Sequence, residues 1–449
     1  MQKSRSFSLI MRQGLEALRL NILYMHGRWR MAKSDQARRT RIHRHRPDID
    51  KGDLRRYPFR EPLPLRLRVS YRGIIRDTQR LLGTYYNPFV LPPSVFFGYE
   101  PEGPGHYNAA RHEILLSHEF HYWYRLVGLF FLTMRNALEE ARRDPRCMPW
   151  NEIGQRLLKR GATCEELIGM REQHFFVDLL PAWRTFVEQL PSFLTECERT
   201  ERISEALLTW YESLEQLYTM LERQFRWLII HEYLHAQTKW VTQCIGNERF
   251  RLIGVVRLKT DVSFSTSLPL QHRLLNEALT EWMALRFYRQ MASESLQMRW
   301  GELAWGSAYP AWIIEYVAQA LDSQWETLSQ VFPTLRRYHL SSTAGLLSHL
   351  FFVDPGIIQL FKDMVAHVGR QPDAFEKVSD ACERSYRISD EQGLAQQQAA
   401  FQELYDLFAW TFPESTRQVL AFVVAADFAE MLRFAQMDTN VSISAPKTP

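Results

Sequence analysis

Two histidines and a glutamate stand close together in the run His231-Glu232-Tyr233-Leu234-His235. Apolar residues recur around this run and no glycine or proline interrupts it, so the pattern predicts a helix. Positions i and i+4 lie on one face of a helix, so His231 and His235 can offer imidazole nitrogens to one cation. Imidazole suits Zn²⁺, and a catalytic zinc site combines three protein ligands with one open position.

Glu232 follows the first of these histidines directly. Zinc lowers the pKa of a water that it holds toward neutrality, and a neighbouring carboxylate can then accept the proton. Glu232 is therefore the predicted general base. A second interpretation stays open at this point, because a motif this short also occurs by chance. Both histidines could be hydrogen-bonded core residues of a buried helix.

A second acidic motif follows in the run Asn276-Glu277-Ala278-Leu279-Thr280-Glu281. Apolar residues recur around it at helical spacing, which predicts another amphipathic helix. The carboxylates of Glu277 and Glu281 are one helical turn apart and share a face. On spacing alone, either of them could reach a metal held by the two histidines.

The two motifs together, HEYLH and then NEALTE, resemble those of the zincin metallopeptidases, and among these the glutamate-ligand clan (gluzincins) typified by thermolysin. The resemblance implies that Glu277 is the third zinc ligand. It also implies that Asn276 and Glu281 support the ligand set, with Glu281 orienting a ligand histidine through a hydrogen bond. It covers roughly sixty residues and identifies no subfamily. The 42 positions from His235 to Glu277 exceed the spacing in thermolysin itself.

The resemblance implies a zinc-dependent peptidase that acts on a peptide or protein substrate. A peptidase also needs a hydrogen-bond donor for the oxyanion. Tyr309 is the preferred candidate because it stands at the start of a predicted helix, and a packing tyrosine is the alternative. Other candidates are Tyr316, His339 and His349. Two different functions remain open: a zinc hydrolase acting on a non-peptide amide, and a non-catalytic or regulatory binding protein.

Composition places the chain among ordinary globular proteins. It has 449 residues, of which 46% are hydrophobic and 24% charged. Its five cysteines are far apart and form no CxxC motif, which favours a reducing, cytoplasmic compartment over a disulfide framework. Because no apolar run approaches the length of about 20 residues that crosses a bilayer, no transmembrane segment is expected.

The first sixty residues are strongly basic, with 16 Lys/Arg against 5 Asp/Glu, and 38–46 is their densest part. Such an arm can contact nucleic acid or an anionic surface, and a nucleic-acid contact belongs to the binding-protein alternative. A solvated, flexible tail is the favoured interpretation, because aromatic residues are not interleaved with the basic ones.

The pattern predicts a predominantly helical α+β fold. Short strands are predicted at 94–99, 112–117 and 250–256, and a helix at 72–82. By resemblance to zincins, 112–117 would be the edge strand along the substrate cleft. The predicted divisions are a basic arm (1–61), a zincin-like catalytic region with a small N-terminal sheet (62–345) that includes a helical insertion (119–222), a C-terminal helical region (346–437) and a tail (438–449).

Overall fold

Helices make up most of the described structure, a computed structural model, and this confirms the predominantly helical α+β prediction. The described residues are 71–83, 93–98, 105–108, 113–144, 146, 148–169, 179–238, 240–245, 248–259, 272–291, 311–352, 356–386, 391–414 and 417. The predicted arm, the predicted tail and Tyr309 lie outside them. No helix in these ranges is both long and apolar enough to cross a membrane.

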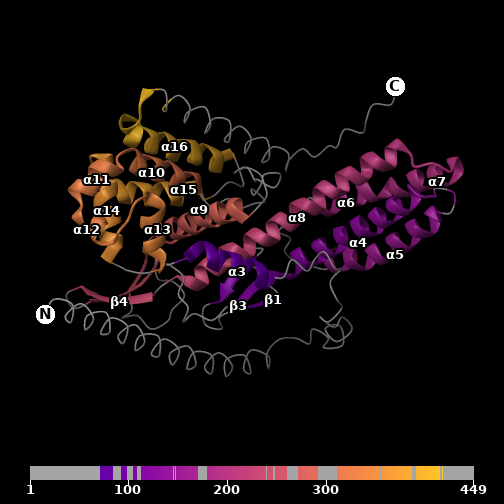
Figure 1. The fold of residues 1–449 in the computed structure, drawn as a ribbon, viewed down its shortest axis with the longest axis horizontal. Coiled ribbons are helices and arrows are strands. Elements are labelled where there is room, and N and C mark those ends of the chain that lie inside the picture. The colour runs from indigo at the N-terminus through magenta and orange to yellow at the C-terminus, as the bar shows by residue number, and fades with distance from the viewer. Residues whose placement is uncertain are drawn as a thin grey trace, which may run out of the picture.

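One long helix, α8 (Glu205–Gln237), runs from an elongated helical bundle to the compact set of C-terminal helices (Figure 1). Its N-terminus is capped by Ser204, whose Oγ accepts a hydrogen bond from Leu207 N at 3.2 Å. Neither glycine nor proline interrupts its 33 residues, which span about 50 Å. The predicted boundary of the helical insertion at 222 therefore falls inside a continuous helix, and the HEYLH motif occupies the last turns of that helix.

The N-terminal half of α8 belongs to an elongated helical bundle (Figure 1). The other helices of the bundle are α4 (His118–Ala141), α5 (Trp150–Gly169), α6 (Leu179–Glu188) and α7 (Leu190–Thr200). Stacked aromatic rings join α4 to α8, with ring centroids 4.6 Å apart for Phe131 and Tyr218 and 5.7 Å apart for Tyr124 and Phe225. Each such pair adds about 0.5–1.5 kcal/mol beyond the burial of its area, so this interface holds α8 firmly.

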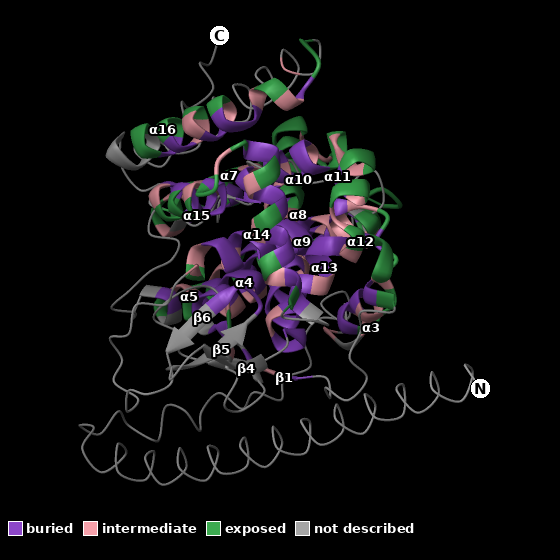
Figure 2. Cartoon of the chain, turned by 90° about the vertical axis from the view of Figure 1, so that its left-hand side faces the viewer, coloured by how far each residue is buried: buried purple, intermediate pink, exposed green. Residues whose placement is uncertain are grey.

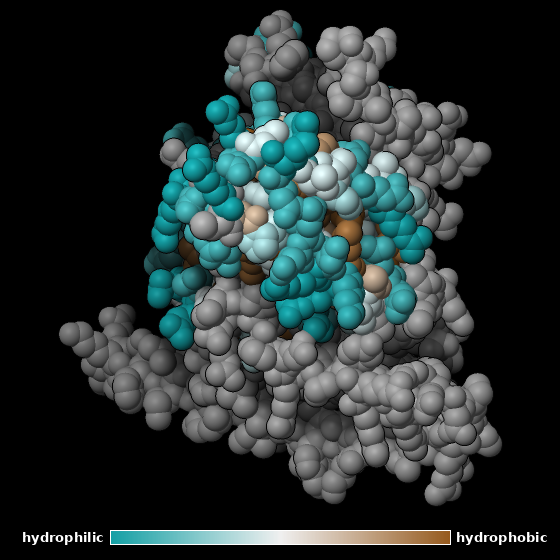
Figure 3. All heavy atoms as spheres, turned by 90° about the vertical axis from the view of Figure 1, so that its right-hand side faces the viewer, coloured by the Kyte–Doolittle hydropathy of each residue, from teal (hydrophilic) through white to brown (hydrophobic). Residues whose placement is uncertain are grey.

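The outer end of the bundle carries no large apolar face in the part drawn in Figure 3. Hydrophilic side chains cover most of that end, and apolar ones show only in small separate spots (Figure 3). Scattered apolar atoms of this kind are normal on a protein surface. The apolar side chains of the bundle instead lie between its helices.

A small mixed sheet precedes the bundle in the chain. Its strands are β1 (Ser94–Gly98), β2 (Gly105–Asn108) and β3 (Glu113–Ser117), in the order β1-β3-β2. β3 pairs parallel with β1 and antiparallel with β2. The prediction that 112–117 forms the edge of the sheet is therefore wrong: this strand is central, and β2 is an edge. Helix α3 (Tyr71–Leu82) confirms the helix predicted at 72–82.

An antiparallel meander connects the two motif helices. It comprises β4 (Trp240–Ile245), β5 (Glu248–Ile253) and β6 (Val256–Lys259). The single strand predicted at 250–256 is wrong, because the chain turns at Gly254 and Val255. Gly254 has φ of +57°, a left-handed conformation that glycine adopts without strain.

The C-terminal half packs as a compact set of helices around α9 (Arg273–Met291), where buried residues gather on the inward faces (Figure 2). The helix predicted around NEALTE is present, but the prediction that it is amphipathic is wrong, because α9 is buried almost all round. The following elements are α10 (Ala311–Ser323), α11 (Trp325–Val331), α12 (Pro333–Arg337), α13 (Thr343–Phe352), α14 (Gly356–Gly369), α15 (Ala374–Ser385), α16 (Glu391–Phe408) and the short 3-10 helix η6 (Ala409–Thr411).

Candidate metal centre

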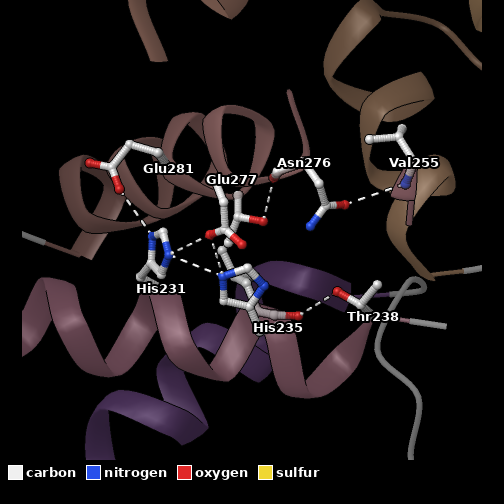
Figure 4. A network of polar contacts seen from close by, with 9 residues as sticks. His231, His235, Thr238, Val255, Asn276, Glu277 and Glu281 are labelled. Carbon is white, nitrogen blue, oxygen red and sulfur yellow. Dashed lines mark hydrogen bonds and ion pairs between the residues drawn. The ribbon is translucent and has the colours of Figure 1, made fainter. Parts of the chain in front are cut away.

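The last turns of α8 place two imidazole rings side by side (Figure 4). His231 and His235 are one helical turn apart, and their ring centroids are 4.8 Å apart. Their Nε2 atoms face one another at 3.1 Å. His231 is almost fully buried, and the side chain of His235 keeps 18% of its surface exposed. The pair therefore presents two ring nitrogens to one small volume.

Helix α9 brings the first carboxylate of the NEALTE motif to the same volume (Figure 4). Glu277 Oε2 lies 3.0 Å from His235 Nε2 and 3.5 Å from His231 Nε2. Within the described part of the chain, these three side chains are the one group of three or more His, Cys, Asp or Glu whose ligand atoms all lie within 4.8 Å of one another. The structure thus brings together the three residues that the resemblance marks as metal ligands.

The second carboxylate of that motif contacts the far side of the His231 ring. Glu281 Oε2 lies 3.0 Å from His231 Nδ1, and both side chains are buried. A proton on Nδ1 can be donated to this carboxylate, which leaves the Nε2 lone pair facing Glu277 and His235. A buried carboxylate in this position fixes both the tautomer and the orientation of the ring.

Glu232 lies on another side of α8, against the small sheet. Its side chain is buried, and a Cβ built at Gly105 of strand β2 would lie 3.6 Å from Glu232 Cγ. The same Cβ would lie 3.2 Å from Leu228 Cδ2, so the strand packs directly on the helix. The absence of a side chain at Gly105 is what allows this close approach. Glu232 thus follows the ligand candidate His231 on α8 and packs against strand β2.

The charges of the carboxylates dominate the electrostatics of the site. Burial acts to lower the pKa of His231, but hydrogen bonds with Glu277 and Glu281 and the nearby charges of Glu232 and Glu281 outweigh it and raise that pKa to about 10. Burial acts to raise the pKa of Glu277, but His235 and His231 hold it well below its ordinary value. The site therefore attracts positive charge, and in the metal-free protein a proton on His231 supplies it.

Burial is the largest influence on Glu281 and raises the pKa of this carboxyl, an effect that His231 offsets only in part. Glu281 therefore needs a hydrogen-bond donor to stay ionised. His231 provides that donor, which makes the pair a unit in which each side chain holds the other.

The donor set fits a zinc ion. Two imidazole nitrogens and one carboxylate oxygen form the His₂Glu set found in catalytic zinc sites. The three ligand atoms converge from two helices, and the outward nitrogen of His231 is already engaged by a carboxylate. Without a metal, the same carboxylate of Glu277 is the hydrogen-bond and ion-pair partner of both histidines.

Asn276 was predicted to support the ligands, but its side chain points elsewhere (Figure 4). Its Oδ1 accepts a hydrogen bond from Val255 N at 3.3 Å, in the turn between β5 and β6. Asn276 and Glu277 are neighbours on a helix and so face different directions. The asparagine holds the connecting meander, and the glutamate faces the histidines.

Of the candidates for stabilising an oxyanion, the structure describes Tyr316, His339 and His349, and all three lie in the C-terminal helical half. Tyr309, the preferred one, lies outside the described residues. Tyr316 is buried among aromatic rings of the C-terminal helices, including Phe408 at 6.2 Å between ring centroids. His339 follows α12, and the ring of His349 packs at 5.7 Å from that of Tyr338.

Two residues of the site were missed in the sequence. The ring of Trp227 lies 5.4 Å from that of His231, and the i, i+4 spacing that pairs the histidines could have placed it on this face. Gly105 begins a strand of four residues, and the sequence just before it is rich in proline and glycine. An alternation this short gives no recognisable strand signal.

A scan against models of protein families, a search of curated proteins and a search of solved structures each found no match to this chain.

Proposed function

We propose that this chain is a zinc-dependent peptidase in which His231, His235 and Glu277 hold the ion and Glu232 is the general base. The observation that carries the proposal is the convergence of two histidines of one helix and a glutamate of another within 4.8 Å. Bound zinc would lower the pKa of a water toward 7 and polarise a substrate carbonyl. The zincin-like architecture of the region 62–345 is part of the same proposal.

The roles of the chain's own residues follow from their positions. Glu281 orients His231 through Nδ1, so that Nε2 stays available as a ligand. The Glu232 carboxylate accepts a proton from the attacking water and delivers it to the leaving nitrogen, as a general base and then a general acid. Its burial against Gly105 restricts the directions in which the carboxylate can point.

The edge strand β2 supports a peptide as the substrate. Among the described strands it pairs with β3 alone, which makes it an edge of the sheet that the structure describes. An extended peptide can add to such an edge through main-chain hydrogen bonds. Because Gly105 of β2 packs beside Glu232, a peptide on this edge would pass close to the general base. We therefore assign to β2 the role of edge strand along the substrate cleft, which the resemblance implied for 112–117.

The test combines metal analysis with cleavage of a broad peptide library. The wild type should contain about one zinc per chain and cleave library peptides. Glu232→Gln should keep the metal and lose cleavage by about 100- to 10,000-fold, because this residue handles the proton and not the ion. Glu212→Gln is the matched control, since Glu212 is an exposed glutamate of the same helix and should be silent.

Two outcomes would contradict the proposal. Full cleavage by Glu232→Gln removes Glu232 as the base. A wild type that binds zinc and cleaves no peptide favours either a hydrolase of a non-peptide amide or a regulatory binding protein. In the second case, deletion of 1–60 decides whether the arm contacts nucleic acid, because such an affinity falls steeply with salt.

A further inference from the structure

The turn between β5 and β6 is inserted between the two helices that carry the ligands. Gly254 and Val255 are both buried, and Val255 is only 2% exposed. A Cβ added at Gly254 would lie 3.3 Å from Thr238 Cγ2 at the end of α8, and 3.4 Å from Phe351 Cδ1 in α13. A turn at the tip of a hairpin is ordinarily exposed to solvent, so its burial here calls for a physical reason.

The start of α9 is fastened to this turn through Asn276. The Val255 N–H donates to Asn276 Oδ1 at 3.3 Å in a buried environment (Figure 4). A Cβ at Gly254 would overlap the same oxygen, so the backbone of the turn packs directly on the asparagine side chain. The left-handed φ of Gly254 and this close approach both require glycine.

We propose that this turn is a spacer that sets the register of α9 against α8, and that Asn276 and Gly254 are positioning residues for the metal ligand Glu277. The inference rests on the metal centre proposed above. Asn276 points to the turn and Glu277, the next residue, points to the histidines (Figure 4). Because the two residues are adjacent, a contact that fixes the position of Asn276 also fixes the position of the Glu277 Cα atom.

The tolerance of a zinc site makes this fastening matter. A helix rises 1.5 Å per residue, so even a fraction of a one-residue slide moves a carboxylate by several tenths of an ångström. Zn–O distances lie close to 2.0–2.2 Å, with a tolerance of about 0.2 Å. The two histidines share α8 and keep their spacing without help. Only Glu277 depends on how α9 is placed, and the turn acts on that placement.

The test uses full-length Asn276→Ala, Gly254→Ala and the double variant. Gly83→Ala is the matched control, since Gly83 has a similar φ of +54° but an added Cβ would meet nothing within 4 Å. Zinc affinity is measured by competition with a chromophoric chelator, and coordination geometry by the absorption of bound Co²⁺. Thermal unfolding of the metal-free proteins reports stability separately.

Asn276→Ala should weaken zinc binding by roughly ten-fold and alter the Co²⁺ spectrum, the low end of what loss of a supporting group costs. Gly254→Ala should weaken it at least as much, whereas Gly83→Ala should lower stability and leave zinc affinity within about two-fold. The losses of affinity in the two single variants should not add in the double variant, because removing the asparagine side chain removes the closest overlap with the new Cβ. If Gly254→Ala fails to fold, Asn276→Ala decides alone, because it introduces no overlap.

Unchanged zinc affinity and an unchanged Co²⁺ spectrum in Asn276→Ala would overturn the inference and leave the proposed function standing. An equal loss of affinity in Gly83→Ala would also overturn it, by showing a general effect of stability. A wild type that binds no zinc would overturn the metal centre and this inference together.

Discussion

His231 is the residue at which the parts of the site meet. Its Nε2 faces Glu277 and His235, its Nδ1 faces Glu281, and its ring packs beside Trp227. A side chain held on three sides loses little conformational entropy when a metal binds, because folding has already restricted it. His235 is more exposed and has fewer contacts of this kind among the described residues.

The two glutamates of α9 should differ in their effect on zinc. Glu277→Ala should abolish nearly all zinc binding, because it removes a ligand atom. Glu281→Ala should weaken binding by about 10- to 100-fold and retain some activity, because it removes the hydrogen bond to His231. Chelator competition measures both.

Glu281→Gln is the conservative control for this pair, since its amide oxygen can still accept the proton of Nδ1 and should restore most of the affinity. Equal losses in Glu277→Ala and Glu281→Ala would show that the assignment of ligand and supporting acid is wrong.

The stability of the metal-free protein should depend on the protonation of His231. The pKa of this group rises from 6.5 to about 10 on folding, so its contribution is fully present below pH 6.5 and is lost as the pH rises toward 10. Denaturant unfolding between pH 6.5 and 10 should therefore show a decline for the wild type and a flatter profile for His231→Gln. If stability declined equally with pH in the wild type and in His231→Gln, the raised pKa would not belong to His231.

At the scale of elements, the positions of several segments could be predicted, but the pairing of strands and the turn between β5 and β6 could not. The HEYLH and NEALTE helices follow from apolar spacing, and α3 and β1 agree with the segments predicted for them. The central position of β3 could not be read from its own residues, because pairing is set by the neighbouring strands. The turn at Gly254 was missed for a similar reason, since its need for glycine arises from Asn276.

The close packing of β2 on α8 gives a prediction at the same scale. Gly105→Val should lower peptide cleavage by about a hundred-fold, because the new side chain displaces Glu232, and small displacements of reacting groups are costly. Zinc content should stay at the wild-type level, since the three proposed ligands belong to α8 and α9 and not to this strand. Steady-state cleavage and metal analysis test this.

His106→Ala on the same strand is the control, since its side chain is exposed and strand alternation turns it to the opposite face. Loss of zinc in Gly105→Val, or full activity, would contradict the proposed contact with Glu232.

At the scale of the whole molecule, α8 joins two parts of different character. Its first half is held by aromatic stacking in the bundle, and its last turns lie among the C-terminal helices (Figure 1). The charge of the sequence is also divided, because the basic first sixty residues precede a remainder that is net acidic. Hydrophobic periodicity foresees the helices of both parts, but it could not foresee that one uninterrupted helix connects them.

The division of the ligands between α8 and α9 has a consequence for the kinetics of folding. Before α9 docks on α8, the chain can offer an ion only the two histidines, and the third ligand arrives 42 positions after His235. If α9 docks after the rate-limiting step, zinc meets its full ligand set only in the native protein. Zinc should then slow unfolding and leave the refolding rate nearly unchanged. Stopped-flow traces with and without zinc measure both rates, and faster refolding with zinc would mean that the two helices meet before the barrier is crossed.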